Sequence, residues 1–297
     1  MLENLDPNSI QSLNETSYEQ LSSLYMKLMD TNGSVTPNRL GVMAYKHLKL
    51  DPLIKEFENY TGNKIKRSRE DQLNFLEQLS NNSLFARVQS YCVCTDRYIE
   101  IITRSVRRLF LGQEKDVKIS QKLFELLSGI SVQMFLNEYV YDYSDDEKKR
   151  VSILISEVES SLRNNELPDE QMLLKISLYQ ELSKFDFGEH RGKLANLEPI
   201  LRRHIDDRSN EKLIAKSFEK SGAFKNQVSN RVKQQYEENP FPRWENTKFN
   251  QRPTSLQNII QNKRTKLKVQ KLYSQPGLKA LVAGCGTGQE PIRVAKN

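Results

Sequence analysis

Residues 123–141 read LFELLSGISVQMFLNEYVY, a stretch in which large apolar side chains outnumber all others. On a helix, these side chains fall on nearly every side instead of forming one stripe. A helix that is apolar almost all round is buried among other elements. We therefore predict a central helix over residues 123–141, with a helical domain packed around it.

A polar pair, Asn137 and Glu138, interrupts this stretch where apolar residues would be expected. Two interpretations fit the sequence equally well. The pair is either a buried polar anchor or contact site, or both side chains point to solvent. The sequence leaves both interpretations open.

The helical domain is predicted to span residues 1–235, because signals for helix starts recur along it. A capping serine with Glu or Gln three residues later, or a capping side chain before a proline, marks a first helical turn. Such signals stand at Ser17-x-x-Gln20, Thr36-Pro37, Asp51-Pro52 and Ser144-x-x-Glu147. Apolar spacing predicts further helices near residues 145–163, 169–184, 192–206, 209–220 and 224–238.

One predicted helix carries basic residues on a single face. From Asp96 onward, apolar residues recur at helical spacing, at Ile99, Ile102, Val106 and Leu109. Three arginines share the opposite face: Arg97, Arg104 and Arg108. This stripe either binds a phosphate group or an acidic partner, or is an ordinary solvated face, and we favour the solvated face.

The 297 residues are 37% hydrophobic and 28% charged, which is the composition of a folded chain. The net charge of +7 comes from basic residues that alternate with acidic ones along most of the chain, residues 263–271 excepted. Such alternation favours a solvated surface, so we do not expect nucleic acid as a partner. No apolar run reaches the ~18 residues that cross a bilayer, so we expect no membrane partner.

The three cysteines are Cys92, Cys94 and Cys285, and the first residues are acidic and polar, unlike a secretory leader. An odd cysteine count without a leader is typical of the reducing cytoplasm, where we expect the protein. Cys92-x-Cys94 has no second pair at zinc-binding spacing. We therefore predict buried or half-buried thiols and no metal site.

At residue 236 the helical pattern gives way to YEENPFPRW, residues 236–244, and then to a connector up to residue 277. Each proline fixes its own φ and favours an extended conformation for the residue before it. A stiff strip of this kind presents Tyr236, Phe241 and Trp244 at low entropic cost. The strip is either an aromatic lid over a ligand or a linker whose aromatic rings dock on the next domain.

Residues 278–293, LKALVAGCGTGQEPIR, predict a strand over 278–283, then a glycine turn, then a helix start. Glycine accepts positive φ and lets a cofactor approach the backbone, and a helix N-terminus behind such a turn adds N–H donors. The spacing fits neither the phosphate-binding loop nor the dinucleotide fingerprint, because Gln289 stands where each needs glycine. The alternative is an ordinary tight turn with structural glycines.

The strip at 236–244, followed by AGCGTGQ at 283–289, resembles a bacterial family of class I S-adenosylmethionine-dependent methyltransferases. Many members of that family carry N-terminal tetratricopeptide repeats. Residues 135–140, FLNEYV, are also similar, so the resemblance covers roughly residues 80–297. It implies S-adenosyl-L-methionine as cofactor and the start of a Rossmann-like α/β domain at residue 278. The cofactor-binding residues that it implies are Gly284, Cys285, Gly286, Thr287, Gly288, Tyr236, Phe241 and Trp244.

The chain departs from that family in three respects. The repeats are missing, and Ala283 stands where many such enzymes hold the amino group of the cofactor with an acidic residue. Residues 278–297 provide one strand and the start of one helix, whereas the family's sheet has several strands. We therefore expect this chain to be the N-terminal part of a longer protein. We also expect the 297-residue polypeptide alone not to bind S-adenosylmethionine measurably.

Two classes of function follow from the sequence. The first, which we favour, is a methyltransferase whose helical domain presents or selects the acceptor, be it a protein side chain, a metabolite, a lipid or a sugar. No residue of the chain is predicted to be a catalytic base, because methyl transfer often needs only proximity and alignment. The second is a helical interaction module that binds a protein or an acidic partner and carries a vestigial cofactor loop.

Overall fold

The computed structural model describes residues 15–31, 37–62 and 67–217, and beyond them only residues 231, 281–282, 286–288, 291, 292 and 295. This described part is mainly helical and contains no strand. Its α-helices are α1 (Glu15–Asp30), α2 (Pro37–Leu48), α3 (Pro52–Gly62), α4 (Arg69–Ser80), α5 (Ser83–Gln89), α6 (Arg97–Leu111), α7 (Gln121–Leu136), α8 (Asp145–Arg163), α9 (Glu170–Ser177), α10 (Glu198–Leu201) and α11 (Arg208–Ser217). Short turns join the last of them: the 3-10 turns η3 (Leu182–Lys184), η4 (Gly188–Lys193) and η5 (Ala195–Leu197), and the π-helical turn η6 (Arg202–Asp207).

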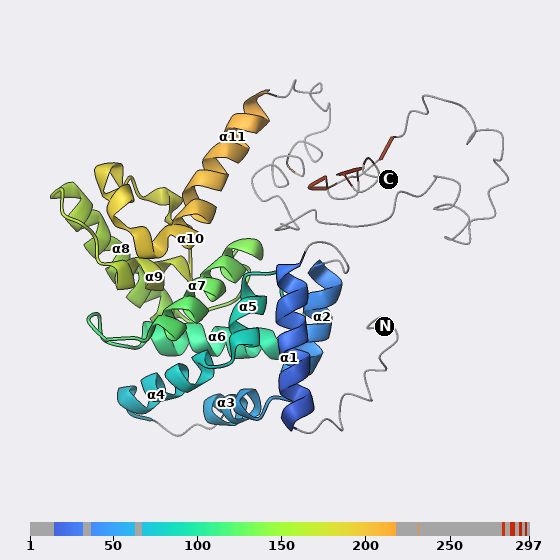
Figure 1. The fold of residues 1–297 in the computed structure, drawn as a ribbon. Coiled ribbons are helices and arrows are strands. Elements are labelled where there is room, and N and C mark those ends of the chain that lie inside the picture. The colour runs from blue at the N-terminus through green and yellow to red at the C-terminus, as the bar shows by residue number, and fades with distance from the viewer. Residues whose placement is uncertain are drawn as a thin grey trace, which may run out of the picture.

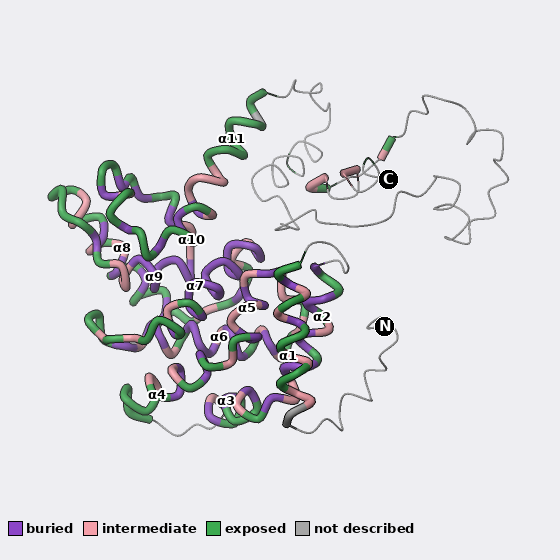
Figure 2. Tube along the Cα trace, in the orientation of Figure 1, coloured by how far each residue is buried: buried purple, intermediate pink, exposed green. Residues whose placement is uncertain are grey.

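Helix α7 lies at the centre of the arrangement (Figure 1). It contacts α4, α5, α6, α9, α10 and η6. Its side chains Leu126, Leu127, Ile130 and Met134 are fully buried, and Figure 2 shows α7 buried along most of its length. The prediction of a central helix from residues 123–141 is therefore confirmed. A helix that is apolar on all sides is stable in water only when neighbouring elements bury it on all sides.

Helices α5 and α7 approach each other closely at Gly129. A Cβ on Gly129 would lie 2.9 Å from the backbone oxygen of Ala86 and 3.4 Å from the Cβ of Gln89. The first of these distances is shorter than real Cβ contacts allow, and a backbone oxygen cannot turn away as a flexible side chain does. The missing side chain of Gly129 is thus what allows these two helices to pack.

The end of the central helix differs from the prediction, because α7 stops at Leu136 instead of Tyr141. Asn137 caps it, and Glu138 and Tyr139 follow with positive φ values of 57° and 54°. Their N–H groups donate to carbonyls of the last turn, which satisfies these carbonyls without a further turn. Val140, expected in the core, is 74% exposed as a result.

Most of the predicted helix starts are found. Ser144 and Glu147 form the capping box at α8, which runs over the predicted residues 145–163. Asp51 accepts the N–H groups of the first turn of α3, and α2 begins at Pro37. The cap predicted at Ser17 is wrong, because α1 already begins at Glu15.

The two helices predicted at 169–184 and 192–206 are broken into shorter pieces. Helix α9 ends at Ser177, and Gly188 lies beyond it with a φ of +46°. In the second segment Pro199 lies in the first turn of the four-residue helix α10, and the π-helical η6 follows. Since proline provides no N–H for a preceding turn, it starts a helix instead of continuing one.

Helix α11 projects away from the other helices (Figure 1), and Figure 2 shows it mostly exposed. It begins one residue before the predicted 209–220 helix and is described as far as Ser217. The helix predicted at 224–238 and the domain boundary at residue 235 lie outside the described residues, apart from residue 231.

The buried side chain of Lys175 in α9 binds the backbone just after the end of α6. The Lys175 ammonium donates to the backbone oxygens of Gln113 at 2.8 Å and Glu114 at 2.9 Å, and it lies 5.3 Å from the centre of the Phe110 ring. Burial lowers the pKa of Lys175 from 10.5 to about 8. Between these two pH values the unfolded chain holds a proton that the folded chain has released.

The contribution of Lys175 to stability is therefore expected to rise with pH over this window, because stability rises wherever the unfolded state binds more protons. The free energy of unfolding of the wild type, minus that of Lys175→Met, should increase by about 2 kcal/mol between pH 8 and pH 10. Taking the difference cancels the opposite effect of Cys92 and Cys94, whose pKa values burial raises from 9.0 to about 11. Urea unfolding at each pH measures it, and a difference that stays constant would show that Lys175 does not titrate there.

Candidate functional site

Three of the predicted cofactor-binding residues, Gly286, Thr287 and Gly288, form a turn. Gly286 has a φ of +55° and Gly288 a φ of +86°, values that favour glycine over any residue with a Cβ. A Cβ at either glycine would meet no atom of the described residues within 4 Å. Behind the turn, Pro291 and Ile292 are helical, and the Ile292 N–H donates to the Gly288 oxygen at 3.2 Å.

The strand predicted at 278–283 is not found at Leu281 and Val282, its two described residues. Leu281 and Val282 lie in no strand, and Leu281 is 92% exposed. A single strand without a neighbour cannot pair its backbone groups, and the described residues offer it none. The other predicted cofactor-binding residues, Tyr236, Phe241, Trp244, Gly284 and Cys285, lie outside the described residues.

A second candidate site lies in the helical region. It is a groove of about 400 Å³, which we call the arginine groove, formed by residues from the end of α3, from α6, from the segment before α8 and from the start of α8. Its lining residues are Glu58, Thr61, Ile101, Arg104, Ser105, Arg107, Arg108, Asp142 and Glu147. Two of the three arginines in the predicted stripe, Arg104 and Arg108, line it.

The third arginine of the stripe, Arg97, is exposed and does not line the groove. Arg108 is exposed as well, and Arg104 lies 3.6 Å from Glu100, one turn before it. The predicted apolar face is found: Ile99, Ile102 and Val106 are fully buried, and Leu109 is partly buried. The exposure of Arg97 and Arg108 fits the solvated face that we favoured, and the groove along Arg104 and Arg108 fits the phosphate-binding alternative.

Arg107 was not predicted as a site residue, and it is the largest fully buried side chain described. One guanidinium nitrogen donates to the Asp142 backbone oxygen at 2.8 Å, and another lies 3.6 Å from the Met134 sulfur. The guanidinium lies 4.4 Å from the centre of the Tyr179 ring, a cation–π contact. Its helical position was the available signal, because Arg107 falls between Thr103 and Phe110 on the buried face of α6.

Glu147, in the first turn of α8, is linked to Arg107 through Tyr179. One of its carboxylate oxygens accepts the Tyr179 hydroxyl at 2.8 Å, and the other accepts the Ser144 N–H at 2.8 Å. Burial lowers the pKa of Arg107, while Tyr179 and Glu147 act to raise it. Burial raises the pKa of Tyr179, with Arg107 acting against the rise. The Tyr179 ring and the Asp142 backbone oxygen contact the Arg107 cation directly, and Glu147 acts on it through Tyr179.

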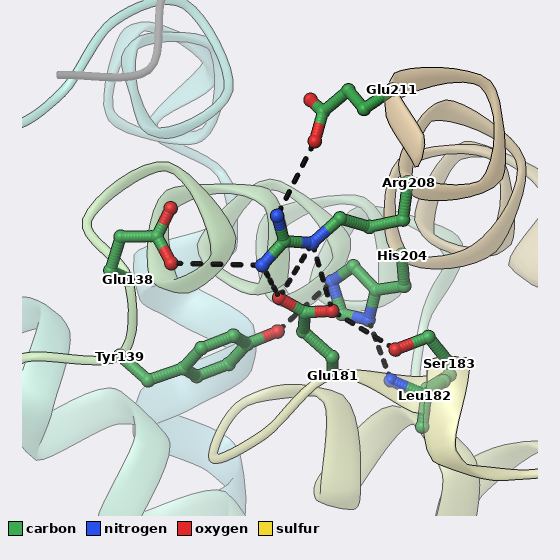
Figure 3. A network of polar contacts seen from close by, with 8 residues as sticks. All are labelled: Glu138, Tyr139, Glu181, Leu182, Ser183, His204, Arg208 and Glu211. Atoms are coloured by element: carbon green, nitrogen blue, oxygen red, sulfur yellow. Dashed lines mark hydrogen bonds and ion pairs between the residues drawn. The ribbon is translucent and has the colours of Figure 1, made fainter. Parts of the chain in front are cut away.

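A polar network lies where the end of α7 meets η3, η6 and α11 (Figure 3). Arg208 binds both carboxylate oxygens of Glu181, at distances of 2.8 to 3.2 Å, and approaches Glu138 at 3.9 Å. Burial by itself would raise the pKa of Glu181, but its hydrogen bonds to Arg208 bring it below its usual value. Asn137 is buried and Glu138 faces Arg208, so the interpretation in which both point to solvent is wrong.

His204 lies fully buried in the same network. Its Nδ1 accepts the Leu182 N–H at 3.2 Å, so a neutral ring carries its proton on Nε2, which lies 3.2 Å from the Tyr139 hydroxyl oxygen. The two left-handed residues Glu138 and Tyr139 are what aim these side chains at Arg208 and His204. The network joins the central helix to the elements that precede α11.

The next features concern metal binding, the cysteines and membrane spans within residues 15–31, 37–62 and 67–217. No group of three or more His, Cys, Asp or Glu side chains is placed to hold a metal ion there. Cys92 is buried and Cys94 partly buried, both as free thiols, as predicted. Among the helices described, none is both long and apolar enough to cross a bilayer.

No protein-family model matches the chain, and searches of curated proteins and of solved structures find no match either.

Proposed function

We propose that residues 278–297 contribute to an S-adenosylmethionine site and that the protein carrying them is a methyltransferase. The helical region then selects or presents the methyl acceptor. The proposal takes the strip at 236–244 and the loop at 283–289 as parts of one cofactor site, in the manner of the family that they resemble.

The observation that carries the proposal is the backbone at Gly286 and Gly288. Both have positive φ, and no atom of the described residues lies within 4 Å of where their side chains would begin. Packing against neighbouring described atoms therefore does not explain why these positions are glycine. An open, left-handed glycine turn followed by helical residues is a surface on which a cofactor can lie directly against backbone N–H groups.

The test uses the protein expressed from the complete reading frame that encodes this chain. It is incubated with S-adenosylmethionine that carries a tritiated methyl group and with an extract of cells that lack the gene. We expect label to enter one class of acceptor. Gly288→Val should lower the labelling rate at least ~10-fold, because a Cβ at positive φ costs about 1–2 kcal/mol and fills space that the cofactor needs.

Gly192→Val is the matched control, because Gly192 is also open but has no positive φ. It should leave the labelling rate unchanged. No transfer to any fraction of the extract, or an equal rate for Gly288→Val and the wild type, would refute the methyltransferase proposal.

A further inference from the structure

We propose that the arginine groove binds an oxyanion, a phosphate or carboxylate group, and that the Arg107 guanidinium is its anchor. The inference rests only on α3, α6, the start of α8 and the residues that they contact. It is independent of the methyltransferase proposal and fails or holds separately from it.

The donors of Arg107 are under-used for so buried a cation. A guanidinium has five N–H groups, and the partners of Arg107 in the described part of the chain are the Asp142 oxygen, the Met134 sulfur and the side chain of Tyr179. The Nε of Arg107 is buried and meets none there. No described carboxylate lies within 4 Å of its guanidinium to form an ion pair. Burial of a cation in this state costs several kcal/mol unless a further partner binds.

Two more arginines line the groove together with Arg107. Arg104 and Arg108 are three residues before and one residue after Arg107 on α6, and all three line the same groove. Arg108 forms no ion pair with any described residue, and the contact of Arg104 with Glu100 is long, at 3.6 Å. The planar donors of arginine match the oxygens of phosphate and carboxylate groups in pairs.

The acidic residues of the groove are largely occupied by other donors. The Glu147 oxygens accept from Tyr179 and Ser144, and one Asp142 oxygen accepts the Tyr143 N–H at 2.9 Å. Burial, together with the nearby Glu58 carboxylate, raises the pKa of Tyr98 to about 12. These carboxylates nevertheless limit the positive potential, so the groove suits one oxyanion group and not a polyanion such as nucleic acid. Its volume of about 400 Å³ suits a small ligand or a single side chain.

The experiment follows the arginine Nε–H signals of the whole chain by ¹⁵N NMR at constant ionic strength. The probes are inorganic phosphate, acetate and a tripeptide with a central phosphoserine. We expect one Nε–H signal, absent from Arg107→Lys, to shift saturably with at least one probe. If the phosphopeptide binds at least ~10-fold more tightly than inorganic phosphate, the natural ligand is a phosphate group on a polypeptide. If the two affinities are equal, the natural ligand is a free phosphate or another small anion.

Substitution of the exposed Arg108 provides a second test in case Arg107→Lys fails to fold. Arg108→Gln should weaken binding at least ~5-fold, because Arg108 is exposed and its loss removes a charged contact without opening the core. Arg97→Gln is the matched control on the same helix, outside the groove, and should change the affinity less than twofold. Absence of a saturable shift with all three probes, or equal losses for Arg108→Gln and Arg97→Gln, would overturn the inference.

Discussion

Replacement of Asp51 with alanine is expected to destabilise the helical region by about 3–5 kcal/mol, because it leaves several donors without an acceptor. One carboxylate oxygen accepts the N–H groups of Leu53 at 2.8 Å and Ile54 at 3.1 Å. The other accepts the Tyr18 hydroxyl and the Asn82 amide, each at 2.8 Å. Asp51 thus holds α1, the start of α3 and the start of α5 together.

Asp169→Ala is the matched control for this prediction. Asp169 also caps a helix, but its described contact is one backbone N–H, that of Met172 at 2.8 Å, and it is exposed. Its removal should cost about 1 kcal/mol, as for an ordinary N-cap. Urea unfolding followed by circular dichroism compares the two variants. Equal losses would mean that the long-range contacts of Asp51 add nothing to its capping role.

Gly129→Val is expected to destabilise the same region by more than about 3 kcal/mol, because the helices α5 and α7 cannot keep their separation around a side chain. Valine would gain some helix propensity over glycine, but its Cβ would lie 2.9 Å from the Ala86 oxygen. Gly192→Val, in an open 3-10 turn, should change stability by less than about 1 kcal/mol. Wild-type stability for Gly129→Val would contradict the packing of α5 against α7.

The sequence predicted those parts of the fold that depend on local signals. The apolar stretch at 123–141 placed α7 at the centre, and Ser144 and Asp51 marked helix starts that the structure contains. The partners that make Asp51 important were not predictable in this way. Tyr18 and Asn82 lie 33 and 31 residues away along the chain, and only the packing of helices brings them together.

In the candidate sites, too, features that depend on local signals were predicted and features that depend on distant partners were not. The turn at Gly286 and Gly288 was predicted, because a glycine pattern reports directly on backbone φ. Arg107 was missed because periodicity treats an arginine as exposed, whereas the ring of Tyr179, 72 positions further on, makes a buried position possible. The strand at 278–283 fails at Leu281 and Val282, since a strand depends on neighbours that apolar spacing cannot supply.

The most direct test of the proposed function is to find where the cofactor lies on the chain. The protein from the complete reading frame is irradiated with S-adenosylmethionine labelled in its methyl group, digested with trypsin and mapped by mass spectrometry. Trypsin cuts after Lys279 and Arg293, so the glycine turn falls within one peptide, residues 280–293. Saturable label in that peptide, lost in Gly288→Val and kept in Gly192→Val, is the result that the proposal predicts. No saturable label, or label confined to peptides of the helical region, would contradict it.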